Sequence, residues 1–140
     1  MSTLENAATG CVVFNLRRAS RIVTRRYEQA LRPVNLSAFQ FSALVALAKA
    51  GKLPQAKLAS FMGMDVSTLT RNLKPLIKRQ LIETRANPRD GRAKVITITN
   101  DGRACLDRAL PLWEDAQQET LKELNADEWA GLKQAIKLLA

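Results

Sequence analysis

A short helix, a glycine and a second helix follow one another within residues 55–79, and this order restricts the fold more than any other part of the chain. Three residues define the motif, namely Gln55, Ala59 and Gly63 at its first, fifth and ninth positions. A small side chain at Ala59 lets the second helix cross closely over the first, and glycine accepts the positive φ angle of the turn at no steric cost. The spacing predicts a helix-turn-helix.

The second helix of this motif is expected to run from Val66 to about Arg79, with Asp65 as its N-cap, and it is amphipathic. Its apolar stripe is expected to face the core and consists of Leu69, Leu73, Leu76 and Ile77. The opposite face carries one hydroxyl and three cations: Ser67, Arg71, Lys74 and Lys78. Such a helix fits the major groove of duplex DNA, with its N-terminal residues nearest the base edges. We therefore expect DNA contacts from Ser67, Thr68, Thr70, Arg71 and Lys74.

A β-hairpin is expected directly after this helix. Two short runs rich in β-branched residues, 81–85 and 94–99, flank a turn-forming loop at 87–93. On its own, the charged helix would be more typical of a solvated helix in any bundle. A hairpin that follows a helix-turn-helix, however, is typical of a wing, and it favours the DNA-binding interpretation.

Two arginines, Arg89 and Arg92, are expected at the tip of this hairpin, beside Pro88 and Gly91. Arginine on a stiff ribbon can enter the minor groove, where the negative potential of DNA is concentrated. Asp90 lies between the two arginines and would be repelled by phosphate, so we expect it to support the wing by orienting Arg92. Considered alone, the loop could equally be an ordinary polar hairpin tip.

The charge of the chain is distributed unevenly. With 22 Lys and Arg against 13 Asp and Glu, the net charge is +9, a balance that attracts nucleic acid or an anionic membrane surface. Residues 17–32 carry six arginines and one glutamate, and residues 52–94 carry ten basic and three acidic side chains. Residues 101–140 reverse the sign, with five basic and eight acidic side chains. One part of the molecule is therefore expected to meet an anion, and another part to have a different role.

The residue types that are missing exclude several function classes. The chain has no histidine, which removes the usual general base, the Ser-His and Cys-His nucleophilic pairs and histidine zinc sites. Its two cysteines, Cys11 and Cys105, are too few for a structural zinc and too far apart for a CxxC motif. We also find no paired carboxylates on a fixed element and no phosphate-binding glycine loop. We expect neither an enzyme nor a bound metal or cofactor.

A cytoplasmic protein with reduced thiols is expected, because the N-terminus lacks an apolar signal core and no stretch approaches the ~18 apolar residues of a membrane span. The arginines of residues 17–26 leave one alternative open, an amphipathic helix at a membrane surface. They could instead line a cleft for acidic ligands or touch phosphate. Our prediction is that the protein has no membrane partner.

Further helices flank the motif on both sides. Apolar residues recur at near-helical spacing over 12–32 and again in the C-terminal part, where Asn125 and Glu128 predict the start of the last helix. Trp113, Trp129 and a Leu/Ile seam give these helices more apolar surface than one chain covers. Pairing the ends of two chains would bury it and set two recognition helices about one DNA turn (~34 Å) apart. An intramolecular helical subdomain is the alternative.

The order of these elements, with the sequence IETRANPRDGRAKVITITNDGRA in the hairpin region, resembles the MarR family of bacterial winged-helix regulators. The most specific piece is Arg85–Gly102, an Asp- and Arg-rich wing that steps into the long helix. The resemblance implies an obligate dimer formed by the first helix and the last two. It also implies DNA-reading residues at the start of the helix that begins at Val66, and a wing arginine at Arg92. Asn87 departs from the family, in which the residue that opens the wing is often acidic.

The resemblance also implies two routes by which a signal releases DNA. One is a small aromatic or phenolic anion bound between the dimerisation helices and the DNA-binding lobe. The candidate lining residues for this anion are Arg17, Arg21, Tyr27 and Phe41. The other route is peroxide sensing through Cys11, whose thiolate nearby arginines would stabilise, although its place looks displaced from the family's sensor pattern. A packed or idle Cys11 is the alternative, and Cys105 is expected in the core.

These observations predict a mostly α fold with a small β-hairpin wing, a winged helix-turn-helix in one domain spanning residues 1–140. Its DNA-binding lobe is expected at about 36–100, with dimerisation helices at about 10–33 and 101–140. The expected function is that of a homodimeric repressor that binds a pseudo-palindromic operator in double-stranded DNA and is released by a small-molecule ligand. A peroxide-sensing repressor of the same fold and a non-specific architectural nucleic-acid binder are the alternatives.

Overall fold

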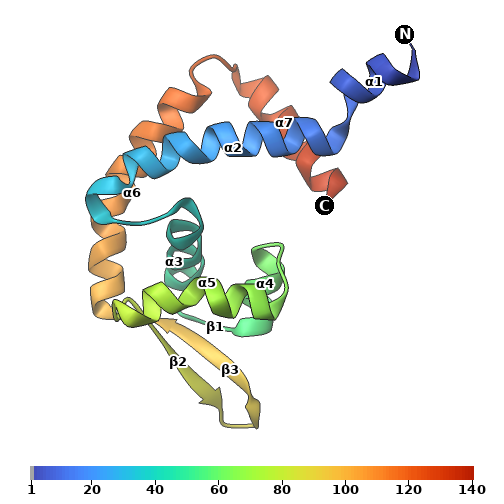
Figure 1. Ribbon diagram of the computed structural model, residues 1–140. Helices are drawn as coiled ribbons and strands as arrows, with labels where there is room; N and C mark the ends of the chain where they lie inside the picture. Colours follow the sequence, from blue (N-terminus) through green and yellow to red (C-terminus); the bar gives the residue numbers. More distant parts are fainter. Residues whose placement is uncertain (1) are drawn as a thin grey trace.

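The computed structural model describes residues 2–140, with the side chains of residues 90–92 outside the description. The chain is mostly helical and carries a small antiparallel sheet, so the predicted fold class, mostly α with a β-hairpin wing, is confirmed (Figure 1). In chain order the elements are α1 (Thr3–Gly10), α2 (Val12–Ala30), the 3-10 helix η1 (Arg32–Val34), α3 (Ala38–Ala50), β1 (Lys52–Pro54), α4 (Gln55–Phe61), α5 (Val66–Lys78), β2 (Ile82–Asn87), β3 (Asp90–Ile98), α6 (Asn100–Leu121) and α7 (Ala126–Leu139).

Side-chain caps set the starts of the central helices where the sequence predicts them. Ser37 and Gln40 form a capping box at the start of α3, and Asp65 accepts a hydrogen bond from the Thr68 amide at the start of α5. Gly63, in the turn after α4, has a φ of 69°. Because this left-handed conformation costs other L-residues about 1–2 kcal/mol, the glycine ends α4 at low cost.

Helix α1 and strand β1 were not indicated by the sequence, and neither was the short η1. Helix α1 is held by a capping box between Ser2 and Glu5. Strand β1 adds a third strand to the hairpin, so that the sheet order is β1-β3-β2, and Leu53 pairs with Ile96. A strand of three residues that ends in proline is too short to show an alternating pattern, which explains why it was missed.

The hairpin is longer than expected, because β3 begins at Asp90 rather than after the loop. Asn87 pairs with Asp90, and the register shifts between Ala86 and Asn87. The low strand propensity of Asp and Gly predicted a loop here, but backbone pairing with β2 overrides that preference. The tip of the hairpin is therefore a tight turn at Pro88 and Arg89.

The core lies between α3, α4, α5, the sheet and the first half of α6. Its fully buried side chains include Leu44, Leu47, Leu58, Leu69, Leu76, Ile82, Ile96 and Cys105, so the predicted core position of Cys105 is confirmed. One prediction was wrong: Ile77 does not belong to the buried stripe of α5, because its side chain is 38% exposed. Each residue turns a helix by roughly 100°, so the position after Leu76 already faces the flank.

The wing is fixed to the start of α6 through Thr99. The Thr99 hydroxyl donates a hydrogen bond of 2.6 Å to the carbonyl oxygen of Gln80 and accepts one of 3.0 Å from the Gly102 amide. The Thr99 amide donates to the Leu81 carbonyl at 3.0 Å. The step from wing to long helix is therefore held to the residues that follow α5 by two hydrogen bonds, while the third caps the start of α6.

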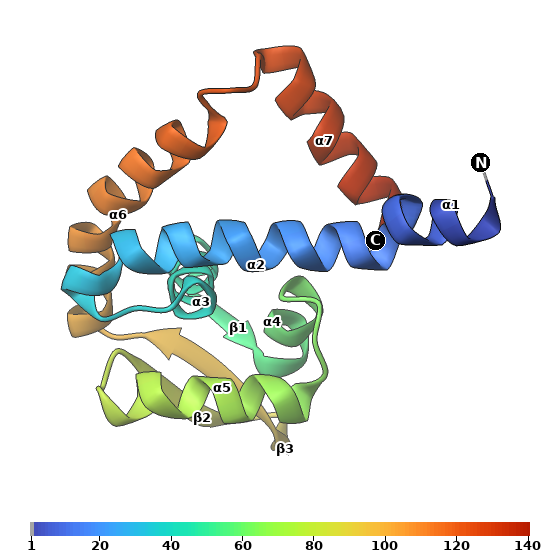
Figure 2. The same cartoon turned by 45° about the horizontal axis from the view of Figure 1, so that its top comes forward.

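The helices α2, α6 and α7 extend beyond this core as three sides of an open triangle (Figure 2). Helix α2 packs along α6, where the Tyr27 hydroxyl donates a hydrogen bond to Oε1 of Gln117. Helix α7 turns back from the far end of α6, and its own end lies near the start of α2 (Figures 1 and 2). Both ends of the chain thus lie on the same side, away from the wing.

Candidate nucleic-acid interface

Helices α4 and α5 form the predicted helix-turn-helix. Ala59 is only 3% exposed in α4, which agrees with the small side chain expected there. The Met64 amide donates to the Ala59 carbonyl at 3.0 Å, and the Gly63 amide donates to the Ser60 carbonyl at 3.1 Å. These bonds close the turn and fix the angle at which α5 leaves α4.

One face of α5 is buried in the core and the other is open to solvent. Leu69, Leu73 and Leu76 hold the buried side. The exposed side chains include most of those predicted to contact DNA: Ser67, Thr70, Arg71 and Lys74, with Lys78 one turn further along. Thr68 is only half-buried. The helix therefore presents three cationic side chains and two hydroxyls on a convex surface, as docking in the major groove requires.

Asp65 organises the first turn of α5. Its Oδ1 accepts hydrogen bonds from the Thr68 amide at 2.7 Å and from the Ser67 hydroxyl at 2.8 Å. Its Oδ2 accepts from the Thr68 hydroxyl at 3.1 Å. These three bonds, the amide bond first, lower the pKa of the Asp65 carboxyl from 3.8 to about 2. The carboxylate is therefore ionised at any physiological pH.

The wing projects beyond α5 at the far side of the molecule from the chain ends (Figure 1). At its tip Arg89 is exposed, and its amide donates a hydrogen bond of 3.0 Å to Oδ1 of Asn87. This bond fixes the turn from within, so the family's acidic residue is not needed at Asn87 to hold the backbone. The side chains of Asp90 and Arg92 lie outside the described residues, and the DNA contact and support predicted for them stay predictions.

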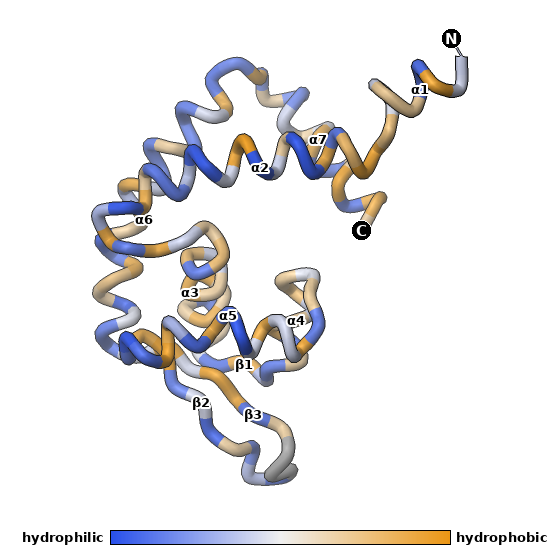
Figure 3. Tube along the Cα trace, in the orientation of Figure 1, coloured by the Kyte–Doolittle hydropathy of each residue, from blue (hydrophilic) through white to orange (hydrophobic). Residues whose placement is uncertain are grey.

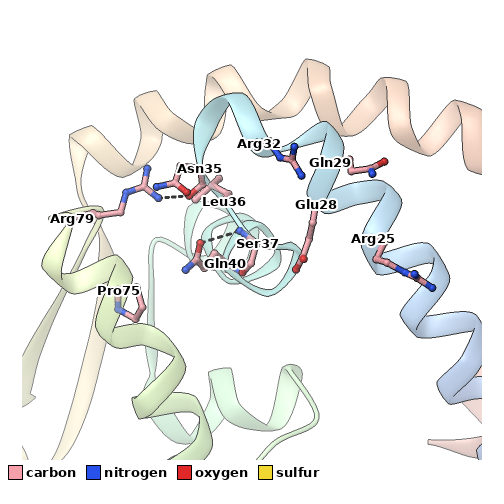
Figure 4. A pocket seen from close by; sticks show the side chains of 10 residues that line it. All are labelled: Arg25, Glu28, Gln29, Arg32, Asn35, Leu36, Ser37, Gln40, Pro75 and Arg79. Carbon is pink, nitrogen blue, oxygen red and sulfur yellow. Dashed lines mark hydrogen bonds between the residues drawn. The ribbon is translucent and has the colours of Figure 1, made fainter.

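A polar pocket of about 630 Å³ lies where α2, η1, the start of α3 and the second half of α5 meet (Figure 4). Three arginines line it together with Glu28: Arg25 from α2, Arg32 from η1 and Arg79 directly after α5. Arg79 is held in place by hydrogen bonds to the carbonyl oxygens of Asn35 at 2.5 Å and Val34 at 3.1 Å. The sequence pattern did not indicate that these three arginines come together. The sequence feature that could have indicated it is the run of arginines before Pro33, considered together with Arg79 directly after α5.

The four predicted ligand-binding residues do not meet in one pocket. Arg17 and Arg21 border a shallow depression on α2 itself. Tyr27, ten residues and thus about 15 Å along α2 from Arg17, is bonded to α6. Phe41 is buried and stacks on Trp113 with ring centroids 5.9 Å apart. Any ligand that contacted all four would have to span separate surfaces.

Cys11 and the ends of the chain lie away from this interface. Cys11 is partly exposed in the break between α1 and α2. None of the described helices combines the length and apolar content needed to cross a bilayer. Across the part of the chain that the structure describes, Cys, Asp and Glu side chains do not gather in threes as a metal would need.

Large apolar side chains are exposed on both terminal segments. At the N-terminal end they belong to α1 and the first turns of α2: Leu4, Val12, Val13, Phe14 and Leu16. At the C-terminal end they follow the last helices: Leu124, Leu132, Ile136, Leu138 and Leu139. Figure 3 shows these apolar stretches at the start of α2 and the end of α7. The exposed fraction reaches 77% at Leu138. So much apolar surface at one end of a protein is typical of an association site.

Comparisons with known proteins agree with this geometry. A family model described as the MarR family matches residues 36–94. The multiple antibiotic resistance protein MarR of Salmonella typhimurium is 33% identical over 108 residues, which cover 76% of this chain and 75% of that protein.

Two solved structures with DNA share the fold. A MarR variant from Escherichia coli, complexed with operator DNA, superposes with a TM-score of 0.86 and 27% identity over 99% of both chains. The transcriptional regulator MosR of Mycobacterium tuberculosis, in complex with DNA, gives a TM-score of 0.84 and 34% identity over 92% of both chains. With this identity, coverage and shared fold, the chain belongs to the MarR family of winged helix-turn-helix transcriptional regulators.

Proposed function

We propose that this protein is a transcriptional repressor that binds a pseudo-palindromic operator as a homodimer. The observation that carries the proposal is α5, whose cationic face is exposed while its leucine face is anchored in the core. The lobe at about 36–100, with α5 and the wing, binds DNA. The relatives named above include two solved in complex with DNA, and their fold matches this chain over nearly its whole length. Acting on chromosomal DNA, the protein would work in the cytoplasm.

The dimer is formed by the segments at about 10–33 and 101–140. Their exposed apolar side chains lie at the opposite end of the molecule from the wing, so that pairing leaves α5 free. The C-terminal segment is also net acidic, with five basic against eight acidic side chains over 101–140, which makes it a poor surface for DNA. A twofold axis through these ends would place the two copies of α5 about 34 Å apart, one turn of DNA.

A small anion releases the repressor from DNA. The polar pocket supports this part of the proposal, because Arg25 (in α2) and Arg32 (in η1) lie within the segment at about 10–33 that is proposed for dimerisation, whereas Arg79 directly follows α5. An anion held between them would couple the position of α5 to that of α2. Such coupling changes the distance between the two recognition helices and hence the affinity for the operator.

Peroxide sensing through Cys11 is a second candidate for the signal. One observation favours it: of the two cysteines, Cys11 is the one that solvent reaches, because Cys105 is buried. Replacing Cys11 with Ser separates the two routes. If peroxide releases DNA from the native protein but not from the Cys11→Ser variant, the thiol is the sensor, and the anion is not required.

Selection from random duplexes, followed by salt titration, tests the repressor proposal itself. At physiological salt, a regulator binds its selected site more tightly than random duplex by a large factor, on the order of 10³ or more. A non-specific architectural binder shows the same steep salt dependence but a ratio near one. Selection that yields no shared half-site would contradict the proposal.

A further inference from the structure

The hydroxyl groups of Ser67 and Thr70, near the start of α5, donate their hydrogens to oxygen atoms of the protein itself. The Ser67 hydroxyl lies 2.8 Å from Oδ1 of Asp65, and the Thr70 hydroxyl lies 2.8 Å from the carbonyl oxygen of Val66. An ionised carboxylate and a carbonyl group can only accept hydrogen bonds. In each pair the hydroxyl must therefore be the donor, and its one hydrogen is directed at a protein oxygen.

What these hydroxyls offer to DNA is set by this arrangement. A hydroxyl has one hydrogen and two lone pairs, so Ser67 and Thr70 present lone pairs alone at the exposed surface of α5. Phosphate oxygens have no hydrogen to give, and neither do N7 and O6 of guanine. In the major groove the groups that donate are the amino groups of the bases, N4 of cytosine and N6 of adenine.

We propose that Asp65 fixes Ser67 as a hydrogen-bond acceptor, so that Ser67 selects a cytosine or adenine through the amino group of that base. Asp65 is then a positioning residue, which acts on sequence preference without touching DNA. Ser67 is placed for this role, because it lies in the first turn of α5 and its side chain is exposed. The inference rests on the proposed function and specifies how the same interface reads sequence.

The cationic side chains of Arg71 and Lys74 complement Ser67, because they can only donate hydrogen bonds. Arg71 follows Ser67 by one helical turn on the same face, and Lys74 follows Arg71 by a further turn. Both are donors alone, suited to guanine or to phosphate. Along α5, the acceptor hydroxyls of Ser67 and Thr70 thus precede the donor side chains of Arg71 and Lys74. The negative charge of Asp65 next to the groove adds nothing to DNA affinity, which agrees with a role in orientation rather than attraction.

Base analogues that lack one functional group test this proposal directly. The probe is the half-site recovered by selection from random duplexes, rebuilt with single replacements. Adenine is replaced by purine, which lacks the N6 amino group, cytosine by 2-pyrimidinone, which lacks the N4 amino group, and guanine by 7-deazaguanine, which lacks N7. At one position of each half-site, removal of the amino group is expected to weaken binding of the native protein by about 5-fold. The Ser67→Ala variant should bind weakly there, with no further loss when the amino group is removed.

Two variants of Asp65 separate orientation from charge. In Asp65→Asn the amide oxygen still accepts from Thr68 and Ser67, so the preference for the amino-bearing base should persist. In Asp65→Gly, an N-cap that helices tolerate, the Ser67 hydroxyl is released and can donate. The amino-group penalty should then fall towards 1-fold, with guanine tolerated at that position.

The failures are distinguishable. If no half-site is recovered by selection, the proposed function itself is wrong. If a half-site is recovered but no amino-group removal is coupled to Ser67, or if 7-deazaguanine gives the coupling instead, Ser67 does not act as an acceptor and the inference is overturned while the repressor proposal stands. An unchanged amino-group penalty in Asp65→Gly would likewise overturn the role of Asp65.

Discussion

Gly102 and Leu81 approach each other so closely that a Cβ atom at Gly102 would lie 2.1 Å from the carbonyl oxygen of Leu81. This contact joins the first turn of α6 to the start of the hairpin, beside the Thr99 hydrogen bonds. The wing, the end of α5 and the long helix meet at this point. A glycine here therefore lets α6 approach the start of the hairpin at close range.

Gly102→Ala should destabilise the protein strongly. The added methyl group would overlap backbone atoms of Leu81, which cannot move without breaking the Thr99 bonds, so a loss of about 1–3 kcal/mol or more in the free energy of unfolding is expected. Gly131→Ala is the matched control, since its Cβ meets nothing within 4 Å and helix propensity favours alanine. Urea denaturation of both variants measures the difference. Equal stability of the two would contradict the close packing.

The stability lost on substituting Gly63 should depend on how well the new residue tolerates a positive φ, not on the size of its side chain. Its φ of 69° lies in the left-handed region, and a Cβ there would meet nothing within 4 Å. Gly63→Ala is expected to cost about 1–2 kcal/mol in unfolding free energy, and Gly63→Asn less, because asparagine tolerates this region better. Thermal denaturation of the pair gives the ranking. A ranking by side-chain volume, with Asn worse than Ala, would count against this account.

Much of the central fold was predictable from local chemistry. Ser37, Asp65 and Gly63 mark helix ends by capping and by positive φ, which depend on a few neighbouring residues, and each stands where it was expected. Strand β1 was missed because its pairing partner, β3, lies more than forty residues further on. Ile77 was misplaced because an apolar residue next to a buried stripe fits a pattern whether or not its face is covered.

For the interface too, local sequence predicted some features and the arrangement of distant elements determined the others. The exposed cationic face of α5 followed from helical spacing, since Arg71 and Lys74 must lie opposite the leucines. The pocket of Arg25, Arg32 and Arg79 did not, because it needs the angle between α2 and α5, which no local pattern contains. The proposed ligand residues Arg17, Arg21, Tyr27 and Phe41 failed to converge for the same reason.

Lowering the pH should reduce the free energy of unfolding of the native protein more than that of a variant without an ionisable side chain at position 65. Hydrogen bonds from Thr68 and Ser67 lower the pKa of Asp65 from 3.8 to about 2, so the folded state binds fewer protons than the unfolded state at low pH. The stabilisation from Asp65 is therefore complete above its unfolded pKa and is lost as the pH falls through about 2. Asp65→Asn keeps the cap but not the charge. The stability difference between the two proteins, measured in urea over this range, should shrink towards low pH. A constant difference would contradict the prediction.

Charge placed in the exposed apolar surface should separate the dimer into monomers. Ile136→Glu puts a carboxylate on a side chain that is 46% exposed in the single chain and that pairing would bury. Sedimentation equilibrium is expected to show dimers for the native protein and monomers for the variant, with loss of operator binding. Ile77→Ser removes a comparably exposed apolar side chain, but from α5, and should leave the dimer intact. A native protein that sediments as a monomer at high concentration would overturn the proposed assembly.

Arginines of α5 and the wing should differ in what their removal does to DNA binding. Arg71→Ala is expected to lose discrimination between operator and random duplex by about 1–3 kcal/mol, because Arg71 is exposed on α5 and, in the proposed docking, would face the base edges. Arg92→Ala and Arg89→Ala should instead weaken binding to all duplexes, most of all at AT-rich flanks, and reduce the slope of log affinity against log salt by about 1 each. Arg108→Ala, which removes the same charge from the exposed surface of α6, is the control and should leave the affinity ratio unchanged.

Fluorescence anisotropy across a salt series measures the affinity ratio and the salt slope in one experiment. Operator binding at native affinity in both Arg71→Ala and Arg92→Ala would mean that α5 and the wing do not dock as proposed, since no other exposed helix of the lobe carries this spacing of cations among the described residues.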